Sequence, residues 1–157
     1  MSPATDWTSS PESGAGGEIG TYLLALWLEA PQQVSIGRLG CFEFPAGWYL
    51  YVGSARGPGG LAARLARHQR RLGIQKRPHW HVDFLREWAT WGGAWRRTGA
   101  ERLECAWAAS ICRLPDAAVV APGFGASDCY CPAHLIHLPT LPEDEWFIQV
   151  LEAKRLE

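Results

Sequence analysis

The stretch WYLYVGSARGPGGLAARLARH, residues 48–68, predicts a strand, a glycine-rich loop and a basic helix in direct succession. Its first five residues alternate two tyrosines with apolar side chains, so the predicted strand has a different environment on each face. Leucines then recur at helical spacing through Leu61–Leu72. Within that helix Arg64 and His68 lie four residues apart, so they share one face. We therefore expect Arg64 and His68 to point together toward the sheet.

A longer apolar run, GTYLLALWLE at Gly20–Glu29, predicts a central strand, because both of its alternating faces are apolar. It carries Tyr22 near its start, as the second strand carries Tyr51 near its end. A phenol, a guanidinium and an imidazole in one cleft suit phosphoryl transfer, because one group can manage the proton of a nucleophile while a fixed cation stabilises negative charge. The loop Gly53–Gly60 lacks the patterns of nucleotide-binding loops, and we expect it to bring the helix close to the sheet or to a phosphate.

The remaining sequence predicts an α+β fold, a small three-stranded antiparallel sheet flanked by helices, with an extra hairpin between the first two main strands. The other expected elements are the hairpin at Val34–Phe44, helices at His81–Ala89 and Glu101–Cys112, a third strand at Ala94–Thr98, a loop over 122–132, an apolar stretch at His134–Leu138 and a last helix opened by Pro142. By domain, we expect a disordered tail at 1–18, one domain at 19–140 and a C-terminal segment with a short helix at 141–157.

Size and composition limit the class of protein. A chain of 157 residues, 47% of them hydrophobic, is long enough for one globular domain and too short for two ordinary ones. No apolar run approaches the roughly 20 residues of a membrane helix, and the N-terminus has no signal peptide pattern. We therefore expect a cytoplasmic protein without a membrane partner. Five cysteines, an odd count in such a chain, argue against a disulfide framework.

Basic residues are concentrated in one part of the chain, although the net charge is only −1. Residues 1–55 contain five acidic residues and one basic residue, whereas residues 56–77 contain seven basic residues and no acidic one. Such a stripe is typical of a surface beside a phosphate backbone, and a solvated helix face is the alternative. The residues expected to contact nucleic acid are Arg56, Arg67, Arg70, Arg71, Lys76 and Arg77.

The order of these motifs resembles the GIY-YIG nuclease superfamily, with Gly20-Thr21-Tyr22 and Tyr51-Val52-Gly53 in the two name-giving positions. The fuller pattern is similar to a branch described as a domain of unknown function, which is sometimes found fused to DNA-repair glycosylases. The resemblance covers roughly residues 20–138. Its matching pieces are Tyr51–Ala55, Gly59-Gly60, Arg64, Arg67-His68, His79–Asp83, Gly123–Gly125 and Ser127–Cys129.

The resemblance implies a metal-dependent endonuclease that cleaves DNA phosphodiester bonds with Mg²⁺ or Mn²⁺, in DNA repair or processing. It implies a fixed cation on the scissile phosphate and one carboxylate on the metal ion. The catalytic residues that it implies are Tyr22, Tyr51, Arg64, His68 and His81. Glu104 corresponds best to the metal ligand, because it lies inside the predicted helix, whereas the competing Glu101 lies at its cap.

This chain departs from the superfamily pattern in two ways. Thr21 and Val52 replace isoleucine, and both keep a β-branched strand residue. The chain also has no asparagine, whereas many family nucleases use a late asparagine near the metal. Ser127, Asp128 or His134 are the candidates to replace it. The alternative function is therefore a catalytically weak or inactive module of the same fold that binds DNA or RNA.

Cys129, Cys131, His134 and His137 have side-chain types that zinc prefers. Their spacing is tighter than in common structural zinc sites, and the two histidines face apart if the segment is a strand. We therefore favour a structural loop that closes near the active site, with His134 touching that site, over a zinc site. We expect Cys129 and Cys131 to be reduced and not joined to each other. A zinc-stabilised interaction domain is a third functional alternative.

Overall fold

A five-stranded antiparallel sheet forms the centre of the computed structural model, which describes residues 17–70, 78–126, 129 and 131–156. The strand order is β6-β4-β1-β5-β7, and a separate two-stranded sheet pairs β2 with β3. The strands are β1 (Gly20–Leu28), β2 (Gln32–Ile36), β3 (Gly40–Phe44), β4 (Gly47–Ala55), β5 (Thr90–Thr98), β6 (Leu135–Leu138) and β7 (Lys154–Leu156). The helices are η1 (Gly37–Leu39), α3 (Gly60–Gln69), α4 (His81–Arg86), α5 (Glu104–Cys112) and α6 (Asp144–Leu151).

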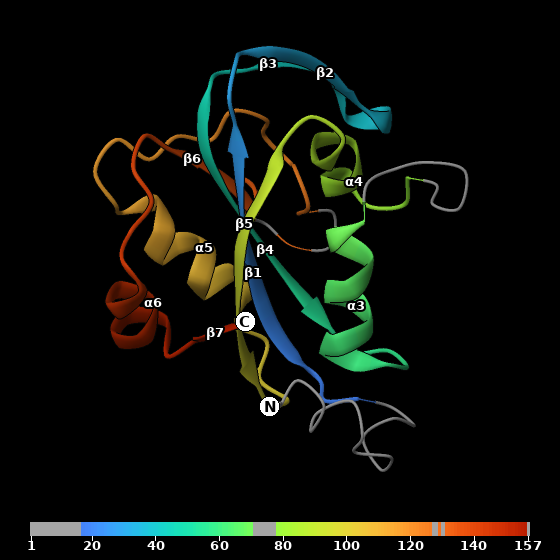
Figure 1. The fold of residues 1–157 in the computed structure, drawn as a ribbon, viewed down its shortest axis with the longest axis vertical. Helices are drawn as coiled ribbons and strands as arrows, with labels where there is room; N and C mark the ends of the chain where they lie inside the picture. Colours follow the sequence, from blue (N-terminus) through green and yellow to red (C-terminus); the bar gives the residue numbers. More distant parts are fainter. Residues whose placement is uncertain (1–16, 71–77, 127–128, 130, 157) are drawn as a thin grey trace.

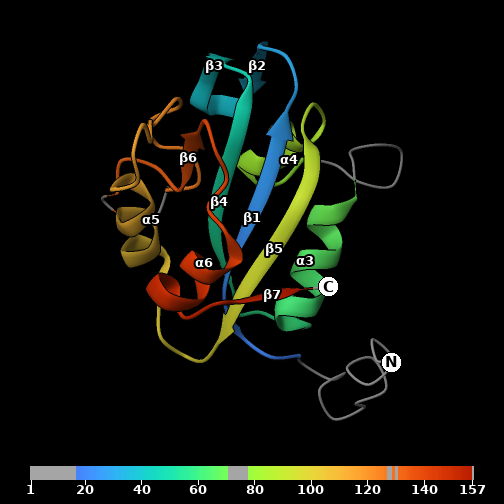
Figure 2. The same ribbon diagram turned by 60° about the vertical axis from the view of Figure 1, so that its left-hand side comes forward.

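Helices cover both faces of this sheet. In Figure 1, α3 and α4 lie on one side and α5 and α6 on the other. Figure 2 shows β4, β1 and β5 running side by side through the middle of the molecule. The central strand, β1, is buried along almost its whole length, as its apolar sequence predicts.

The alternation of side chains along the strands creates two hydrophobic cores. Tyr22 and Leu24 of β1 point into the core beneath α3 and α4, whereas Leu23 and Ala25 point into the core beneath α5 and α6. In β4, the tyrosines at positions 49 and 51 belong to the first core, and Leu50 and Val52 belong to the second. The predicted division of β4 into a tyrosine face and an apolar face is confirmed.

The expected hairpin is present as β2 and β3, joined through η1. It follows the central strand and packs against α4, where the ring of Phe84 lies under the turn at Gly37. Gly37 has a φ of 47°, a conformation that glycine adopts without steric strain. The hairpin thus extends the first core beyond the end of the main sheet.

The sheet itself is larger than predicted. Instead of three strands it has five, because two short strands extend its edges. Strand β6 forms within the apolar stretch at His134–Leu138 and pairs with β4, while β7 follows the last helix and pairs with β5. Strands of four and three residues carry too little alternation to be identified from sequence.

The predicted helices are all present, with shifted boundaries. Helix α4 ends at Arg86 and α5 begins at Glu104, each shorter than expected. The third strand begins earlier than expected, at Thr90. The last helix starts two residues after Pro142, and its Phe147 stacks on Trp95 of β5 with ring centroids 4.0 Å apart. Most of the expected tail lies outside the described residues. None of the helices in the described part of the chain is both long and apolar enough to cross a membrane.

Candidate active site

The hydroxyl of Tyr22 on β1 meets the imidazole of His68 on α3. The distance from Tyr22 Oη to His68 Nε2 is 2.8 Å, and both side chains are only 1% exposed. Tyr51 of β4 completes the group, with its ring centroid 6.4 Å from that of Tyr22 and 6.1 Å from that of His68. The sequence therefore predicted correctly that residues from two strands and one helix would meet. We call Tyr22, Tyr51, Arg64 and His68 the tyrosine site.

The strand register explains why glycine follows the second tyrosine motif. Tyr22 lies opposite Gly53 in the pairing of β1 with β4. A Cβ atom at Gly53 would lie 2.5 Å from Tyr22 Oη, a distance that no side chain can occupy without moving the phenol. Gly53 therefore leaves the space in which the Tyr22 hydroxyl reaches α3.

Two further glycines bring α3 close to the sheet. Gly59 and Gly60 have φ values of 85° and 58°, and a Cβ at Gly60 would lie 2.3 Å from the carbonyl oxygen of Glu18. The amide of Leu61, the second residue of α3, donates a hydrogen bond of 2.7 Å to that same carbonyl. The glycine loop thus has the first of its two expected roles, close approach of the helix to the sheet.

Arg64 lies one helical turn before His68 and contacts the same site. Its Nη1 donates to the carbonyl oxygen of Ser54 over 2.9 Å, and its guanidinium lies 4.4 Å from the ring centroid of Trp80. The positive charge of Arg64 also acts on Tyr22, since it lowers the pKa of that phenol. Because the Arg64 side chain is half-buried, it joins the buried phenol to the surface.

Both phenols of the site are neutral at ordinary pH. Burial raises the pKa of Tyr22 to about 12, although the positive charge of Arg64 opposes that rise. Burial also raises the pKa of Tyr51 well above its usual value, and the neighbouring Tyr22 adds to the effect. The site therefore offers hydroxyl groups rather than phenolates.

Glu104 occupies the first turn of α5, and its side chain is half-buried. Burial is the main cause of the raised pKa of Tyr22 and of Tyr51, and the negative charge of Glu104 is the smallest of the causes that raise each. No hydrogen bond or ion pair to Glu104 is present among the described residues. The competing Glu101 is exposed and pairs instead with Arg97 at 3.5 Å.

Asp83, the other carboxylate near the phenols, is committed to structural contacts. It is fully buried, and its Oδ2 accepts hydrogen bonds from Arg67 at 3.0 Å and from the backbone amides of His79 at 2.7 Å and Trp80 at 3.0 Å. These contacts fix the first turn of α4. Glu104 is therefore the carboxylate suited to a hard cation, which needs one or two carboxylates besides water and substrate oxygens.

His81 lies beside the site rather than within it. Its Nδ1 accepts a hydrogen bond of 2.8 Å from the backbone amide of Gly125, and its ring packs 5.5 Å from that of Phe124. Phe124 in turn packs 6.1 Å from Tyr51. Burial lowers the pKa of His81, which favours the neutral imidazole. Because Nδ1 accepts, the ring proton of neutral His81 is on Nε2.

Of the six basic residues expected on nucleic acid, the three that the structure describes have separate surroundings. Arg56 donates to the carbonyl oxygen of Glu101, and Arg67 forms an ion pair with Asp83. Arg70 follows the last turn of α3 and is exposed. The remaining three candidates, Arg71, Lys76 and Arg77, lie outside the described residues, as do Ser127 and Asp128.

Three of the four residues weighed for zinc lie together, and a residue that sequence reasoning missed joins them. Cys105, Cys129, Cys131 and His134 place one ligand atom each within 4.8 Å of the others. We call these four residues the cysteine cluster. His137 lies elsewhere, with its Nε2 2.8 Å from the carbonyl oxygen of Ala46. Cys129 and Cys131 are not joined by a disulfide in this structure, and their reduced state stays a prediction.

Two other residues of the region were not singled out from sequence. Trp80 packs against His68 at 5.5 Å and lies under both Arg64 and Arg67, so it orients the two guanidinium groups. Gly125 touches two candidates, since its amide bonds His81 and a Cβ there would lie 2.8 Å from the Tyr51 ring. The sequence feature that could have identified Trp80 was a large aromatic residue between two histidines.

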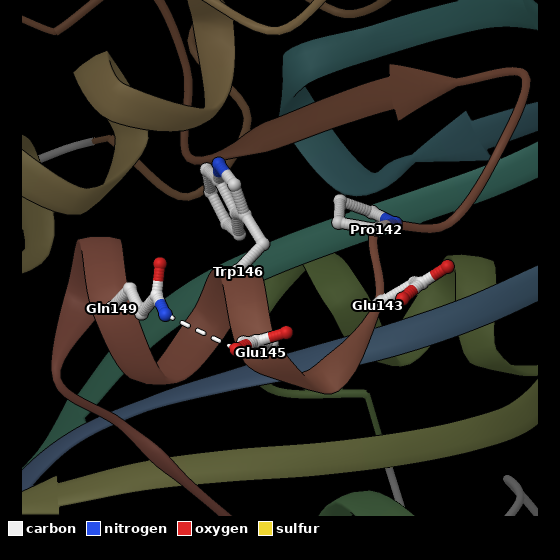
Figure 3. Close-up of a pocket in the computed structure, with 5 residues that line it drawn as sticks. All are labelled: Pro142, Glu143, Glu145, Trp146 and Gln149. Carbon is white, nitrogen blue, oxygen red and sulfur yellow. Dashed lines mark hydrogen bonds between the residues drawn. The ribbon is translucent and has the colours of Figure 1, made fainter.

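Two surface hollows of the described residues have no residue of the tyrosine site in their lining. Figure 3 shows the first, along α6, where Gln149 donates to Glu145 over 3.2 Å. The second is lined by charged residues at the end of β5, including Arg96 and Glu18, which form an ion pair at 3.0 Å. The first hollow has no cation in its lining, and in the second the arginines are paired with carboxylates, Arg96 with Glu18 and Arg97 with Glu152. The tyrosine site therefore remains the candidate.

Comparison with known proteins gives one match. The family model described as domain of unknown function DUF123 matches residues 21–155, nearly the whole chain. No curated protein and no solved structure matches the chain.

Proposed function

The chain belongs to the DUF123 family, and we propose that it is a metal-dependent endonuclease that cleaves phosphodiester bonds of DNA, as the GIY-YIG nucleases that its sequence resembles do. One observation carries the proposal. Tyr22, Tyr51, Arg64 and His68 converge from two strands and one helix. The half-buried carboxylate of Glu104, in the first turn of α5, contributes to the raised pKa of both phenols. This set supplies a proton acceptor, a fixed cation and a metal ligand.

The proton chemistry follows from the contact between Tyr22 and His68. A water molecule that attacks phosphorus must lose a proton, and a phenol with a pKa of about 12 is a poor base by itself. Tyr22 Oη therefore accepts the proton of the water while its own proton passes to His68 Nε2, 2.8 Å away. This relay forms no free phenolate. The bond to the leaving oxygen breaks as the bond from water to phosphorus forms.

Arg64 is the residue suited to the scissile phosphate. Its guanidinium is fixed by Ser54 and Trp80, so little entropy is lost when it pairs with a phosphate oxygen. It stabilises negative charge on the pentavalent phosphorus. A Mg²⁺ or Mn²⁺ ion held by Glu104 would supply charge stabilisation at the leaving oxygen.

The burial of the phenols defines what can bind. Tyr22 and Tyr51 are 1% and 4% exposed, so a nucleobase of the substrate cannot enter between their rings. Arg64 and Glu104 are only half-buried. The site therefore suits a phosphate of the backbone laid across Arg64, with exposed Arg70 farther along α3. Recognition of this kind reads the backbone rather than the base sequence.

The same burial favours a second candidate function, a nucleic-acid-binding module with weak or no catalysis. A water molecule must reach Tyr22 Oη, and this chain lacks the asparagine that many nucleases of the superfamily use. Binding without turnover is the outcome that this candidate predicts.

A single-turnover cleavage screen separates the two functions. Purified protein is mixed with labelled single-stranded, double-stranded and branched DNA and with RNA, with Mg²⁺, Mn²⁺ or neither. Glu104→Gln keeps the shape of the side chain but removes its charge, so we expect cleavage to fall by orders of magnitude while binding persists. Glu101→Gln, one turn earlier and exposed, is the matched control and should cleave at the wild-type rate.

Arg64→Ala tests the phosphate contact in the same assay. Losing a preorganised contact to the transition state lowers the cleavage rate by about 10²-fold or more. Arg38→Ala, which removes an exposed arginine from η1, should have no such effect. Wild-type rates in both Glu104→Gln and Arg64→Ala would reject the site. A wild type that binds but cleaves no substrate would leave the binding module.

A further inference from the structure

The cysteine cluster brings together four metal-binding side chains that the proposed cleavage reaction does not use. Cys105 comes from the first turn of α5, Cys129 and Cys131 from the loop before β6, and His134 from the residue that precedes β6. None of the five cysteines belongs to a disulfide. Three thiols and an imidazole from separate segments therefore meet at one point.

The spacing of the four ligand atoms matches a tetrahedral centre. Cys129 Sγ lies 3.3 Å and Cys105 Sγ 3.9 Å from His134 Nε2, and all four atoms lie within 4.8 Å of one another. A zinc ion about 2.3 Å from sulfur and about 2.0 Å from nitrogen sets those ligands about 3.6 Å apart in tetrahedral geometry. The two measured sulfur–nitrogen distances lie on either side of that value.

Backbone hydrogen bonds hold the loop in this arrangement. The amide of Gly123 donates to Pro132 and the amide of His134 to Phe124, each over 2.7 Å. The carbonyl oxygen of His134 accepts from Val52 of β4 over 2.9 Å, which ties the loop to the sheet. The ligands at positions 129, 131 and 134 are thus presented by a folded loop rather than by an extended chain.

The imidazole of His134 is buried and directed at the sulfur atoms. Its side chain is 7% exposed, and its Nε2 is the ring nitrogen that faces Cys105 and Cys129. Gly125, with a φ of 69°, also packs tightly against Tyr51 and His134.

We propose that Cys105, Cys129, Cys131 and His134 bind one Zn²⁺ ion in a four-coordinate structural site. Three thiolates and one imidazole are ligands that zinc prefers, and a complete set of four protein ligands leaves no position for substrate. Binding releases the three thiol protons to solvent. This assignment reverses the sequence-based preference for a loop without metal, because Cys105 supplies the fourth ligand that His137 does not.

The zinc site also fixes the position of the neighbouring candidate active site, a consequence that rests on the proposed function. Cys105 directly follows Glu104, and the N-terminus of α5 has no side-chain cap among the described residues. Gly125 donates a hydrogen bond to His81 and packs against both Tyr51 and His134, so it lies between the two sites. Zinc therefore ties the first turn of α5 to the loop before β6 and holds Glu104 near the phenols.

Elemental analysis of the full chain tests the site directly. The protein is expressed in zinc-supplemented medium without a histidine tag and purified without chelator, and we expect about one zinc per chain. Cys105→Ser and Cys131→Ser should each lose that zinc. Cys112→Ser, on the same helix as Cys105, and Cys41→Ser, on the hairpin, change exposed cysteines outside the cluster and should retain it.

A second pair of variants tests the nitrogen ligand. His134→Gln should lose zinc, whereas His137→Gln, three residues later and outside the cluster, should keep it. If the cysteine variants fail to fold, metal binding by the wild-type protein still tests the site. After removal of zinc, added Co²⁺ should give the visible absorption of tetrahedral cobalt and its thiolate charge-transfer band.

The outcomes separate this site from the proposed nuclease activity. Stoichiometric zinc in a protein that cleaves nothing would support the zinc site and reject the nuclease. Wild-type protein without bound metal that also fails to bind Co²⁺ would overturn the zinc site, as would zinc retained in both Cys105→Ser and Cys131→Ser. Iron in place of zinc would overturn the assignment of the metal.

Discussion

The two faces of the central sheet differ in what they bury. Beneath α3 and α4, the sheet covers His68, Asp83 and Arg86 together with the phenols of Tyr22 and Tyr51. Beneath α5 and α6, the core is almost entirely apolar and includes the stacked rings of Trp95 and Phe147. The same strands therefore build a polar face and an apolar face.

The polar face tolerates its buried charges because each is held by several partners. Arg86 donates to the carbonyl oxygens of His68 at 3.1 Å, Gln69 at 2.9 Å and Ala89 at 2.7 Å. Two of these acceptors are the last residues of α3, whose C-terminal carbonyls lack helical partners. Arg86 thus joins α4 to the end of α3 and fixes the turn that carries His68.

The largest effect on stability is expected on the apolar face. Phe147→Ala removes a fully buried ring that stacks on Trp95, so the free energy of unfolding should fall by about 3–5 kcal/mol. Urea unfolding followed by circular dichroism measures this change. The cleavage rate per folded molecule should stay at the wild-type value, because the ring lies on the face away from the tyrosine site.

Ile148→Ala is the matched control for this prediction. Ile148 follows Phe147 on α6 but is 53% exposed, so its removal should change the free energy of unfolding by less than about 0.5 kcal/mol. Equal losses in the two variants would mean that α6 does not form the apolar face as described.

Alkaline pH should instead act on the polar face. Tyr22 keeps its proton up to a pKa of about 12 when folded, whereas an unfolded tyrosine releases it near 10. Below pH 10 both states are protonated and stability is unaffected. As pH rises from 10 to 12 the unfolded chain alone loses this proton, so stability falls by about 3 kcal/mol for Tyr22.

Tyr22→Phe isolates that contribution. The variant should lose less stability than the wild type between neutral pH and pH 12, by about the same 3 kcal/mol, because Tyr51 and Tyr49 still titrate in both proteins. Denaturant unfolding at a series of pH values measures the difference. Parallel curves for the two proteins would contradict the burial of the Tyr22 hydroxyl.

The polar face was predictable from sequence where its geometry depends on local periods. The alternation of β1 and β4 and the i,i+4 spacing of α3 were enough to place Tyr22, Tyr51 and His68 together. The pairing of Arg67 was not predictable, because it depends on Asp83 being fully buried and in need of a positive partner.

Contacts between distant segments were the other limit. Cys105 lies in a helix far along the chain from Cys129, and only the docking of α5 beside β6 brings them together. The edge strands β6 and β7 also depend on contacts between distant segments, because they pair with β4 and β5. The sequences of β4 and β5 predict strands whether or not these edge strands are present. The metal ligand set and the width of the sheet therefore needed the tertiary structure.

The smallest expected effect comes from two tyrosines on the same face of β4. Tyr49 donates its hydroxyl to the carbonyl oxygen of Pro45, whereas the Tyr51 hydroxyl makes no hydrogen bond with a described residue. Tyr49→Phe should therefore lower the free energy of unfolding by about 1 kcal/mol and leave cleavage unchanged. Tyr51→Phe should change stability by less than about 0.5 kcal/mol but slow single-turnover cleavage by at least about tenfold. Both variants remove a phenolic oxygen from the same strand and the same core, so they differ only in the position of the tyrosine. Equal cleavage rates in the two variants would place Tyr51 among the structural tyrosines and leave Tyr22 and His68 as the proton relay.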